Sequence, residues 1–207
     1  METIFVAMTN YRDPECRWTL RELYNTARHP DRVFVGICRQ VLEPEEDGFE
    51  AGPRPSQVRC VTYNASDARG ACWGKSQAQK LWSGEKYLLN IDGHMRFAQH
   101  WDTSMIEVLA VCPSGKPVLS TFPAPYYPPR TLVVETPHVV ARAFDVNTGL
   151  LLLSREAREL KLPKRGAFIA GCYSFCRASF IEEVPYDPDL YFDGEEISIS
   201  ARAWTWG

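Results

Sequence analysis

Short apolar runs alternate with amphipathic segments and polar turns through the first half of the chain. Continuous apolar runs are typical of buried parallel strands, whereas apolar residues spaced three and four apart indicate helices. Strands are predicted at residues 3–8, 32–38, 58–63 and 87–91, and helices at residues 17–28, 70–82 and 98–112. This alternation predicts an α/β protein with a Rossmann-like, mostly parallel sheet and helices on both faces.

The second half of the chain has a less regular pattern. Residues 122–130 hold four prolines and two tyrosines, which indicates a loop. Strands are predicted at residues 117–121, 133–144, 149–154 and 167–176, and a closing helix at residues 195–204. Residues 133–154 are expected to form a hairpin. No internal repeat or interdomain linker is evident, so residues 1–207 are expected to form one domain.

The strand predicted at residues 87–91 runs directly into Asp92, Gly93 and His94. On an extended backbone Asp92 and His94 point the same way, because alternate side chains share a face. A carboxylate oxygen and an imidazole nitrogen could therefore bind one divalent cation. Transfer from a sugar nucleotide needs such a cation to neutralise the diphosphate leaving group. A strand followed by Asp-Gly is equally typical of a simple turn.

Three other polar groups stand at, or next to, the carboxyl ends of predicted strands, where parallel sheets bind ligands. Residues 9–13 follow the first strand, where polar side chains commonly hold a base or ribose. Arg69 and Lys75 stand near the start of a predicted helix, a position suited to phosphate. Glu195 and Glu196 open the last helix, near a second acidic turn. The alternatives are an ordinary loop, solvated helix charges and the usual preference for carboxylates at helix N-termini.

Composition and charge exclude several classes of function. The net charge is −3 and the chain has no long basic block, so nothing indicates nucleic-acid binding. The apolar runs are far shorter than the roughly 20 residues that span a bilayer, so no transmembrane segment is predicted. The N-terminus lacks the features of a secretory signal. The seven cysteines are scattered and odd in number, which predicts free thiols and a cytoplasmic protein.

Several strings of residues, in order along the chain, carry a resemblance to a known family. They are residues 5–16 (FVAMTNYRDPEC), 35–37, 84–87, 91–97 (IDGHMRF), 101–102, 184–188, 192–196 and 202–205. On these strings the chain is similar to the GlcNAc-transferring glycosyltransferases, which include cytoplasmic enzymes that glycosylate hydroxyproline on a protein acceptor. The closing segment is more distantly similar to the mucin-type polypeptide GalNAc transferases.

This resemblance implies a GT-A fold, a UDP-GlcNAc donor and a hydroxyl acceptor on a protein or glycan. It also implies a Mn²⁺ or Mg²⁺ cofactor and transfer with retention of the anomeric configuration. The resemblance implies that Asp92 and His94 are metal ligands. It implies that the nucleotide sugar contacts Thr9, Tyr11, Arg12, Arg69 and Lys75, with Lys75 facing the diphosphate. It also implies that Glu195 and Glu196 are catalytic carboxylates near the donor sugar and acceptor.

Three departures from the family pattern leave alternatives open. Gly93 stands where serine is usual, and Lys75 stands where arginine is usual, which gives up a bidentate phosphate contact. The sequence ends at Gly207, whereas relatives continue and the GalNAc transferases have a later histidine as third metal ligand. We therefore expect a C-terminally truncated domain or a minimal form with a weaker metal site. The alternatives are a transferase for another nucleotide sugar and a non-catalytic sugar-nucleotide-binding remnant.

Overall fold

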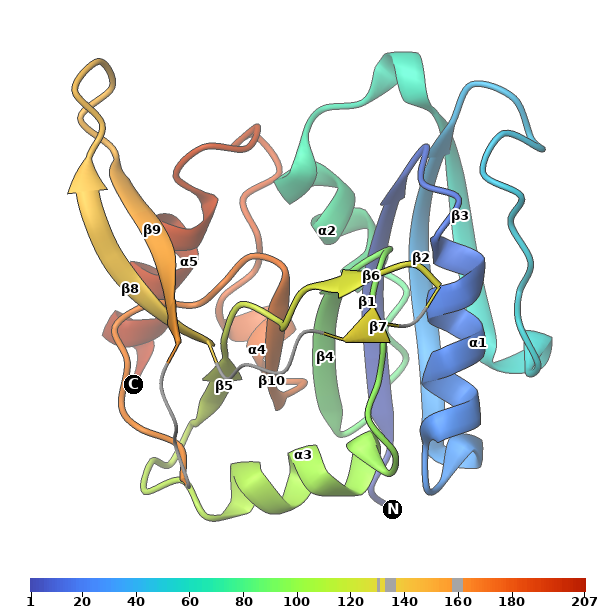
Figure 1. The fold of residues 1–207 in the computed structure, drawn as a ribbon, viewed down its shortest axis with the longest axis horizontal. Coiled ribbons are helices and arrows are strands. Elements are labelled where there is room, and N and C mark those ends of the chain that lie inside the picture. Colours follow the sequence, from blue (N-terminus) through green and yellow to red (C-terminus); the bar gives the residue numbers. More distant parts are fainter. Residues whose placement is uncertain (130, 133–136, 158–161) are drawn as a thin grey trace.

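A computed structural model describes residues 1–129, 131–132, 137–157 and 162–207. Its central feature is a six-stranded sheet with the order β3-β2-β1-β4-β10-β5 (Figure 1). The first four strands in that order are parallel, and β10 is antiparallel to both of its neighbours. The strands of this sheet are β1 (Ile4–Tyr11), β2 (Val33–Val41), β3 (Val58–Asn64), β4 (Tyr87–Asp92), β5 (Val118–Ser120) and β10 (Tyr173–Arg177). The predicted mostly parallel α/β fold is confirmed.

Helices cover both faces of this sheet, as predicted. On one face α1 and α3 pack against the side chains of Ile4, Val6 and Met8, whereas α2, α4 and α5 pack on the opposite face against Phe5 and Ala7. The helices are α1 (Cys16–Thr26), α2 (Ala71–Gln79), α3 (Trp101–Ala110), α4 (Phe180–Glu183) and α5 (Glu195–Trp206), with short 3-10 turns at Pro30–Arg32, Pro55–Gln57 and Ala65–Asp67. Within the described ranges, no helix combines the length and the apolar character needed to cross a membrane.

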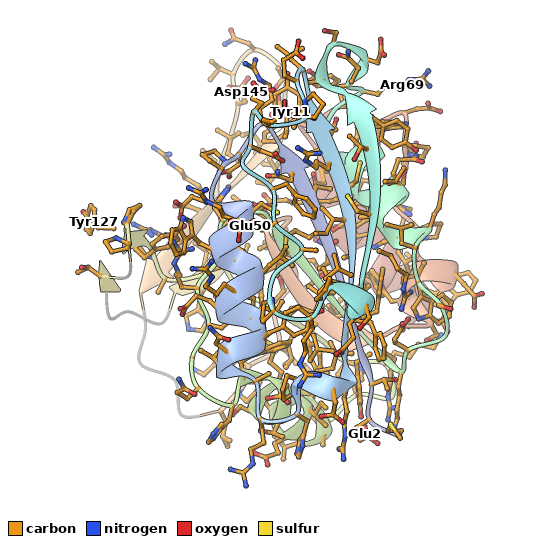
Figure 2. The ribbon with its side chains drawn as sticks, turned by 90° about the vertical axis from the view of Figure 1, so that its right-hand side faces the viewer. Glu2, Tyr11, Glu50, Arg69, Tyr127 and Asp145 are labelled. Carbon is orange, nitrogen blue, oxygen red and sulfur yellow. The ribbon has the colours of Figure 1, made fainter. Side chains whose placement is uncertain are left out.

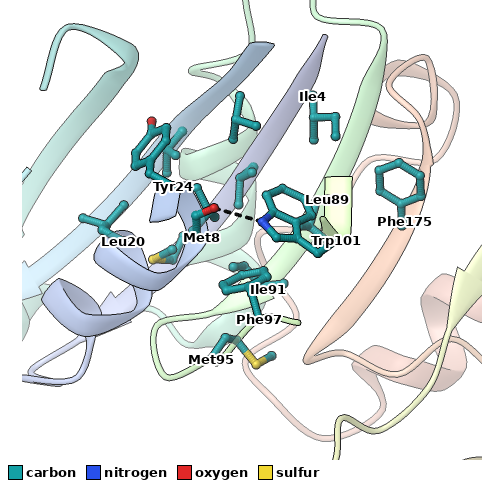
Figure 3. Packing of buried hydrophobic residues seen from close by; sticks show 14 of the residues in the cluster. Ile4, Met8, Leu20, Tyr24, Leu89, Ile91, Met95, Phe97, Trp101 and Phe175 are labelled. Carbon is teal, nitrogen blue, oxygen red and sulfur yellow. Dashed lines mark hydrogen bonds between the residues drawn. The ribbon is translucent and has the colours of Figure 1, made fainter. Parts of the chain in front are cut away.

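The apolar alternation within β1 explains this layering. Successive side chains of a strand point to opposite faces, and every residue from Ile4 to Met8 is buried, so both faces of the strand need a covering layer. On the face covered by α1 and α3, Trp101 packs on Phe97, and its indole Nε1–H donates to the carbonyl of Leu23 at 2.9 Å (Figure 3). This bond ties α3 to α1 across the end of the core.

Two small sheets lie outside the central one. One pairs β6 (Tyr126–Tyr127) with β7 (Thr131–Leu132), and the other pairs β8 (Pro137–Phe144) with β9 (Leu151–Ala157). The β8–β9 pair confirms the predicted hairpin, although residues 133–136 of its predicted first strand lie outside the described residues. The predicted loop at residues 122–130 contains the short strand β6, and residue 130 lies outside the described part.

Several predicted boundaries differ from the structure, and for two strands the reason can be identified. Residues 9–11 were expected in a polar turn, but they extend β1 and pair with residues 38–40 of β2. Thr and Tyr favour strands, and β2 extends far enough to pair with all three residues. The strand predicted at residues 167–176 begins only at Tyr173. Before it, the backbone of Gly171 bonds to side chains from α2, β4 and α5 and is not paired in the main sheet.

The strand order reverses between β1 and β4. The chain passes from β1 through α1 to β2 on one side, then returns through α2 to place β4 on the other side of β1. Such a reversal opens a crevice at the carboxyl ends of the strands, where α/β proteins bind ligands. Thr9 and Asp92 are register partners at this point.

All seven cysteines lie in the described part of the chain and are free thiols. Burial raises the pKa of Cys38 to about 12, and that of Cys72 to about 12 as well. Their native reactivity should therefore be low, since the thiolate is the nucleophile.

We expect thiol titration of denatured, unreduced protein to count close to seven cysteines. The native protein should titrate mainly at Cys60, which is exposed. A denatured count that rises by two or more after reduction would reveal disulfides and contradict the free-thiol assignment.

Candidate functional site

The predicted site residues gather at the carboxyl ends of β1 and β4. Tyr11, which ends β1, and Arg69, which precedes α2, lie at one end of the molecule, and Glu2 lies at the opposite end (Figure 2). Because Thr9 and Asp92 are register partners, the polar residues at the end of β1 and the candidate metal ligands at the end of β4 share one rim. The two segments therefore meet, as the common direction of parallel strands predicts.

His94 is held between two carboxylates. Its Nδ1 lies 2.7 Å from Asp13 Oδ2, and its Nε2 lies 4.0 Å from Asp92 Oδ2. With its proton on Nδ1, His94 donates to Asp13 and presents the Nε2 lone pair toward Asp92. A second carboxylate that fixes the tautomer and ring orientation is typical of a metal-binding histidine.

The backbone between Asp92 and His94 is fixed by α1. The Thr19 hydroxyl donates to the carbonyl of Gly93 at 2.6 Å, and it accepts from the N–H of Met95 at 2.8 Å. A Cβ at Gly93 would lie 2.9 Å from Asn10 Oδ1 and 3.2 Å from the carbonyl of Thr9. Glycine is therefore the residue that this loop accommodates without a shift of its neighbours, which accounts for its presence here.

These ligands fit a hard divalent cation that is shared with a bound substrate. Asp92 and His94 could offer two ligand atoms, and within the described ranges no cluster of three His, Cys, Asp or Glu side chains could hold an ion. Mg²⁺-type ions commonly bind through one or two protein ligands, with waters and substrate phosphates completing the coordination. The donor set therefore suits a cation that binds together with a diphosphate.

The acidic turn at the start of α5 lies against α2. Lys75 and Glu195 form an ion pair in which the two side chains are 5% and 6% exposed. Lys75 Nζ also donates to the carbonyl of Gly171 at 2.6 Å, and the N–H of Gly171 donates to Glu196 at 2.8 Å. Three segments remote in sequence thus meet at this contact.

The carboxyl of Glu196 is only partly buried. Burial raises its pKa above the ordinary value, the N–H of Gly171 and the positive charge of Lys75 lower it, and the negative charges of Glu195 and Asp92 raise it.

The residues expected to contact the nucleotide occupy the rim in different ways. Thr9 is partly buried beside Asp92, whereas Tyr11 is 55% exposed. Arg12 adopts a left-handed φ of 52° and pairs with Glu46, so it is directed to the loop after β2. Arg69 is exposed next to α2. Of this set, the structure therefore brings Thr9 directly alongside a candidate metal ligand.

Sequence reasoning missed two supporting residues. Asp13 was seen as part of a polar turn, but its role in holding His94 depends on contact between segments 81 residues apart. Gly171 was assigned to a strand, and no local signal marks it as the point where Lys75 and Glu196 meet.

The fold and this site define a class of protein: a doubly wound α/β domain with a candidate polar ligand site at the carboxyl ends of β1 and β4. More specifically, the chain belongs to the glycosyltransferase (GlcNAc) family, whose model matches residues 3–51 and 50–207. A search of curated proteins finds no match. Membership of this family supports a transferase that moves a sugar to an acceptor.

Proposed function

We propose that the protein is a metal-dependent glycosyltransferase that moves GlcNAc from UDP-GlcNAc to a hydroxyl group of a protein or glycan. The observation that carries this proposal is the Asp13–His94–Asp92 arrangement at the point where the strand order reverses. Membership of the glycosyltransferase (GlcNAc) family supports the sugar transfer. The free thiols support a reducing compartment such as the cytoplasm.

Asp92 and His94 would hold a Mn²⁺ or Mg²⁺ ion. When bound, this cation offsets the negative charge that grows on the diphosphate as it leaves. Asp13 keeps His94 in the tautomer that presents Nε2, and Thr19 fixes the backbone between the two ligands. These two supporting residues hold the ligand pair in place before the substrate arrives, which lowers the cost of binding.

The transfer itself breaks the bond between the sugar C1 and the diphosphate oxygen and forms a bond from C1 to the acceptor oxygen. The proton of the acceptor hydroxyl passes to the departing phosphate, so retention needs no dedicated base. Thr9, Tyr11, Arg12 and Arg69 would contribute to the nucleotide side of the rim, with Arg12 first releasing Glu46. Glu196 would face the donor sugar or acceptor from the start of α5.

UDP binding should depend on the cation. We expect UDP to bind at least about 10-fold more weakly in chelator than in Mn²⁺, because the cation offsets the diphosphate charge. His94→Ala should abolish most of this difference. Asp13→Asn should weaken Mn²⁺ binding by about 10-fold or more, as is typical when the carboxylate behind a metal-binding histidine is lost. Calorimetric titrations with UDP in Mn²⁺ and in chelator measure the first two effects, and titration of the protein with Mn²⁺ alone measures the third.

His138→Ala is the matched control, because His138 lies on β8, outside the central sheet. Equal UDP affinity with and without Mn²⁺ in the unaltered protein would remove the cation from the proposal. A donor screen that reads UDP release then separates the alternatives. If UDP is released from another UDP-sugar and not from UDP-GlcNAc, the proposed donor is wrong. If UDP binds but no UDP-sugar releases it, the protein is a non-catalytic binder.

A further inference from the structure

The ammonium of Lys75 is enclosed by protein groups. It contacts the carboxylate of Glu195 and donates to the carbonyl of Gly171 at 2.6 Å, and it lies 5.2 Å from the centroid of the Tyr186 ring. Two of its three N–H donors are taken by these oxygen acceptors. A lysine that serves a bound diphosphate would need to leave both partners first.

The surrounding groups keep this ammonium charged. Burial by itself lowers the pKa of Lys75, but the oxygen of Tyr186 and the carboxylates of Glu195 and Asp92 outweigh burial and raise the pKa above its ordinary value. Removing either member of a buried ion pair leaves the other charge unpaired, which is strongly destabilising. The ion pair therefore fixes the start of α5 to α2 across 120 residues of sequence.

Gly171 is built into the same contact. A Cβ at this position would clash with Glu195 Oε1 and would lie 3.2 Å from Lys75 Nζ. Its carbonyl also accepts from Asn90 Nδ2 at 3.4 Å, while its N–H donates to Glu196 at 2.8 Å. The Gly171 peptide thus links Lys75 on one side to Glu196 on the other.

This contact lies on the same side of β4 as the metal ligand Asp92. Asn90 and Asp92 are two residues apart on the strand, so their side chains share a face. Asn90 Nδ2 also donates to the Tyr186 hydroxyl at 3.3 Å, which anchors the segment before α5. The position of Glu196 relative to Asp92 consequently depends on groups that Lys75 holds.

We propose that Lys75 is a positioning residue that fixes Glu195 and the Gly171 peptide, and thereby sets Glu196 beside the metal site, and that Lys75 does not bind the diphosphate. This inference rests on the proposed function and assigns different roles to the two glutamates. Glu195 partners Lys75, and Glu196 is the carboxylate left to face the substrate. The positioning role proposed for Lys75 replaces the direct phosphate contact that the family resemblance implies for this residue.

Comparison of UDP with uridine tests this role, because only UDP carries the phosphates. We expect Lys75→Met to change the ratio of UDP to uridine affinity less than about 2-fold, while kcat for UDP release from UDP-GlcNAc in Mn²⁺ falls about 10-fold or more at unchanged KM. Lys80→Met is the control, since Lys80 is exposed at the end of the same helix. A loss of UDP affinity 10-fold larger than the loss of uridine affinity would place Lys75 on the phosphates and overturn the proposal.

Gly171→Ala tests the same contact without removing a charge. We expect it to displace Glu195 and to lower kcat with UDP affinity retained, as Lys75→Met does. Gly166→Ala is the matched control, because a Cβ there meets no atom within 4 Å. Normal turnover by Gly171→Ala would overturn the positioning role.

Thermal unfolding separates this inference from the proposed function, since it needs no nucleotide. Lys75→Met should lower Tm by about 5 °C or more, and the double variant Lys75→Met/Glu195→Gln should recover part of that loss. If the two substitutions lower Tm additively, the stabilising ion pair between Lys75 and Glu195 is contradicted. Recovery in a protein that binds no UDP would support the ion pair and overturn the function. If Lys75→Met does not fold, the double variant carries the nucleotide comparison.

Discussion

Asp92→Asn is expected to lower kcat/KM for sugar transfer by about 100-fold or more, which corresponds to ~2.7 kcal/mol of lost transition-state stabilisation. Asparagine keeps the size of the side chain but replaces an anionic ligand oxygen with a neutral amide. The Asp92 side chain is 31% exposed at the end of β4, and its Oδ2 lies 4.0 Å from His94 Nε2. The substitution should therefore weaken cation binding without unfolding the domain. Steady-state UDP release in Mn²⁺, together with the melting temperature, measures both effects.

Asp31→Asn is the control for this variant. Asp31 is an exposed carboxylate in the turn before β2, at the amino end of the strand and away from the site. Its replacement should leave transfer unchanged. If Asp92→Asn transfers sugar at the normal rate and still requires Mn²⁺, the cation binds elsewhere and the assignment of Asp92 is wrong.

The meeting of Thr9 and Asp92 could be predicted from the sequence. Continuous apolar runs separated by helices predict parallel strands joined by right-handed crossover connections. The carboxyl ends of parallel strands all lie at one edge of the sheet. Residues at the carboxyl ends of β1 and β4 are then forced to share a rim, and the pairing of Thr9 with Asp92 confirms it. This part of the site follows from strand direction and requires no knowledge of side-chain contacts.

The contacts of Lys75 could not be predicted in the same way. Its position near the start of a helix indicated a phosphate ligand, because local pattern gives the element but not what packs on it. Glu195 and Gly171 come from segments 120 and 96 residues away, and β10 reverses direction between them. The sequence pattern predicts a strand in this region but gives neither its direction nor its neighbour in the sheet. The approach of α5 to α2 therefore could not be predicted.

Helix boundaries show the limits of the pattern on a smaller scale. The helix predicted at residues 98–112 begins at Trp101 and ends at Ala110. His100 adopts a left-handed φ of 60°, which interrupts the helix immediately before Trp101. Its N–H donates to the carbonyl of Thr26 at 2.6 Å, so a contact with the end of α1 decides where α3 starts.

Glu196→Gln is expected to lower transfer or donor hydrolysis by about 10-fold or more, or ~1.4 kcal/mol, with UDP affinity retained. Glutamine keeps the acceptor for the N–H of Gly171 and removes only the charge. A carboxylate that faces the donor sugar or the acceptor should matter to turnover and little to nucleotide binding. Single-turnover UDP release beside a UDP titration separates the two quantities.

The stability of the same variant distinguishes this role from a simple helix-start charge. Burial, Glu195 and Asp92 raise the pKa of Glu196 in the folded protein above its unfolded value, so its ionisation costs stability as pH rises through the folded pKa. In chelator at neutral pH, Glu196→Gln should therefore be at least as stable as the unaltered protein, and any advantage should shrink toward pH 4. A favourable charge at the N-terminus of α5 predicts the opposite, a loss of about 0.3–1 kcal/mol at neutral pH. A lowered melting temperature together with normal turnover would remove Glu196 from the active site.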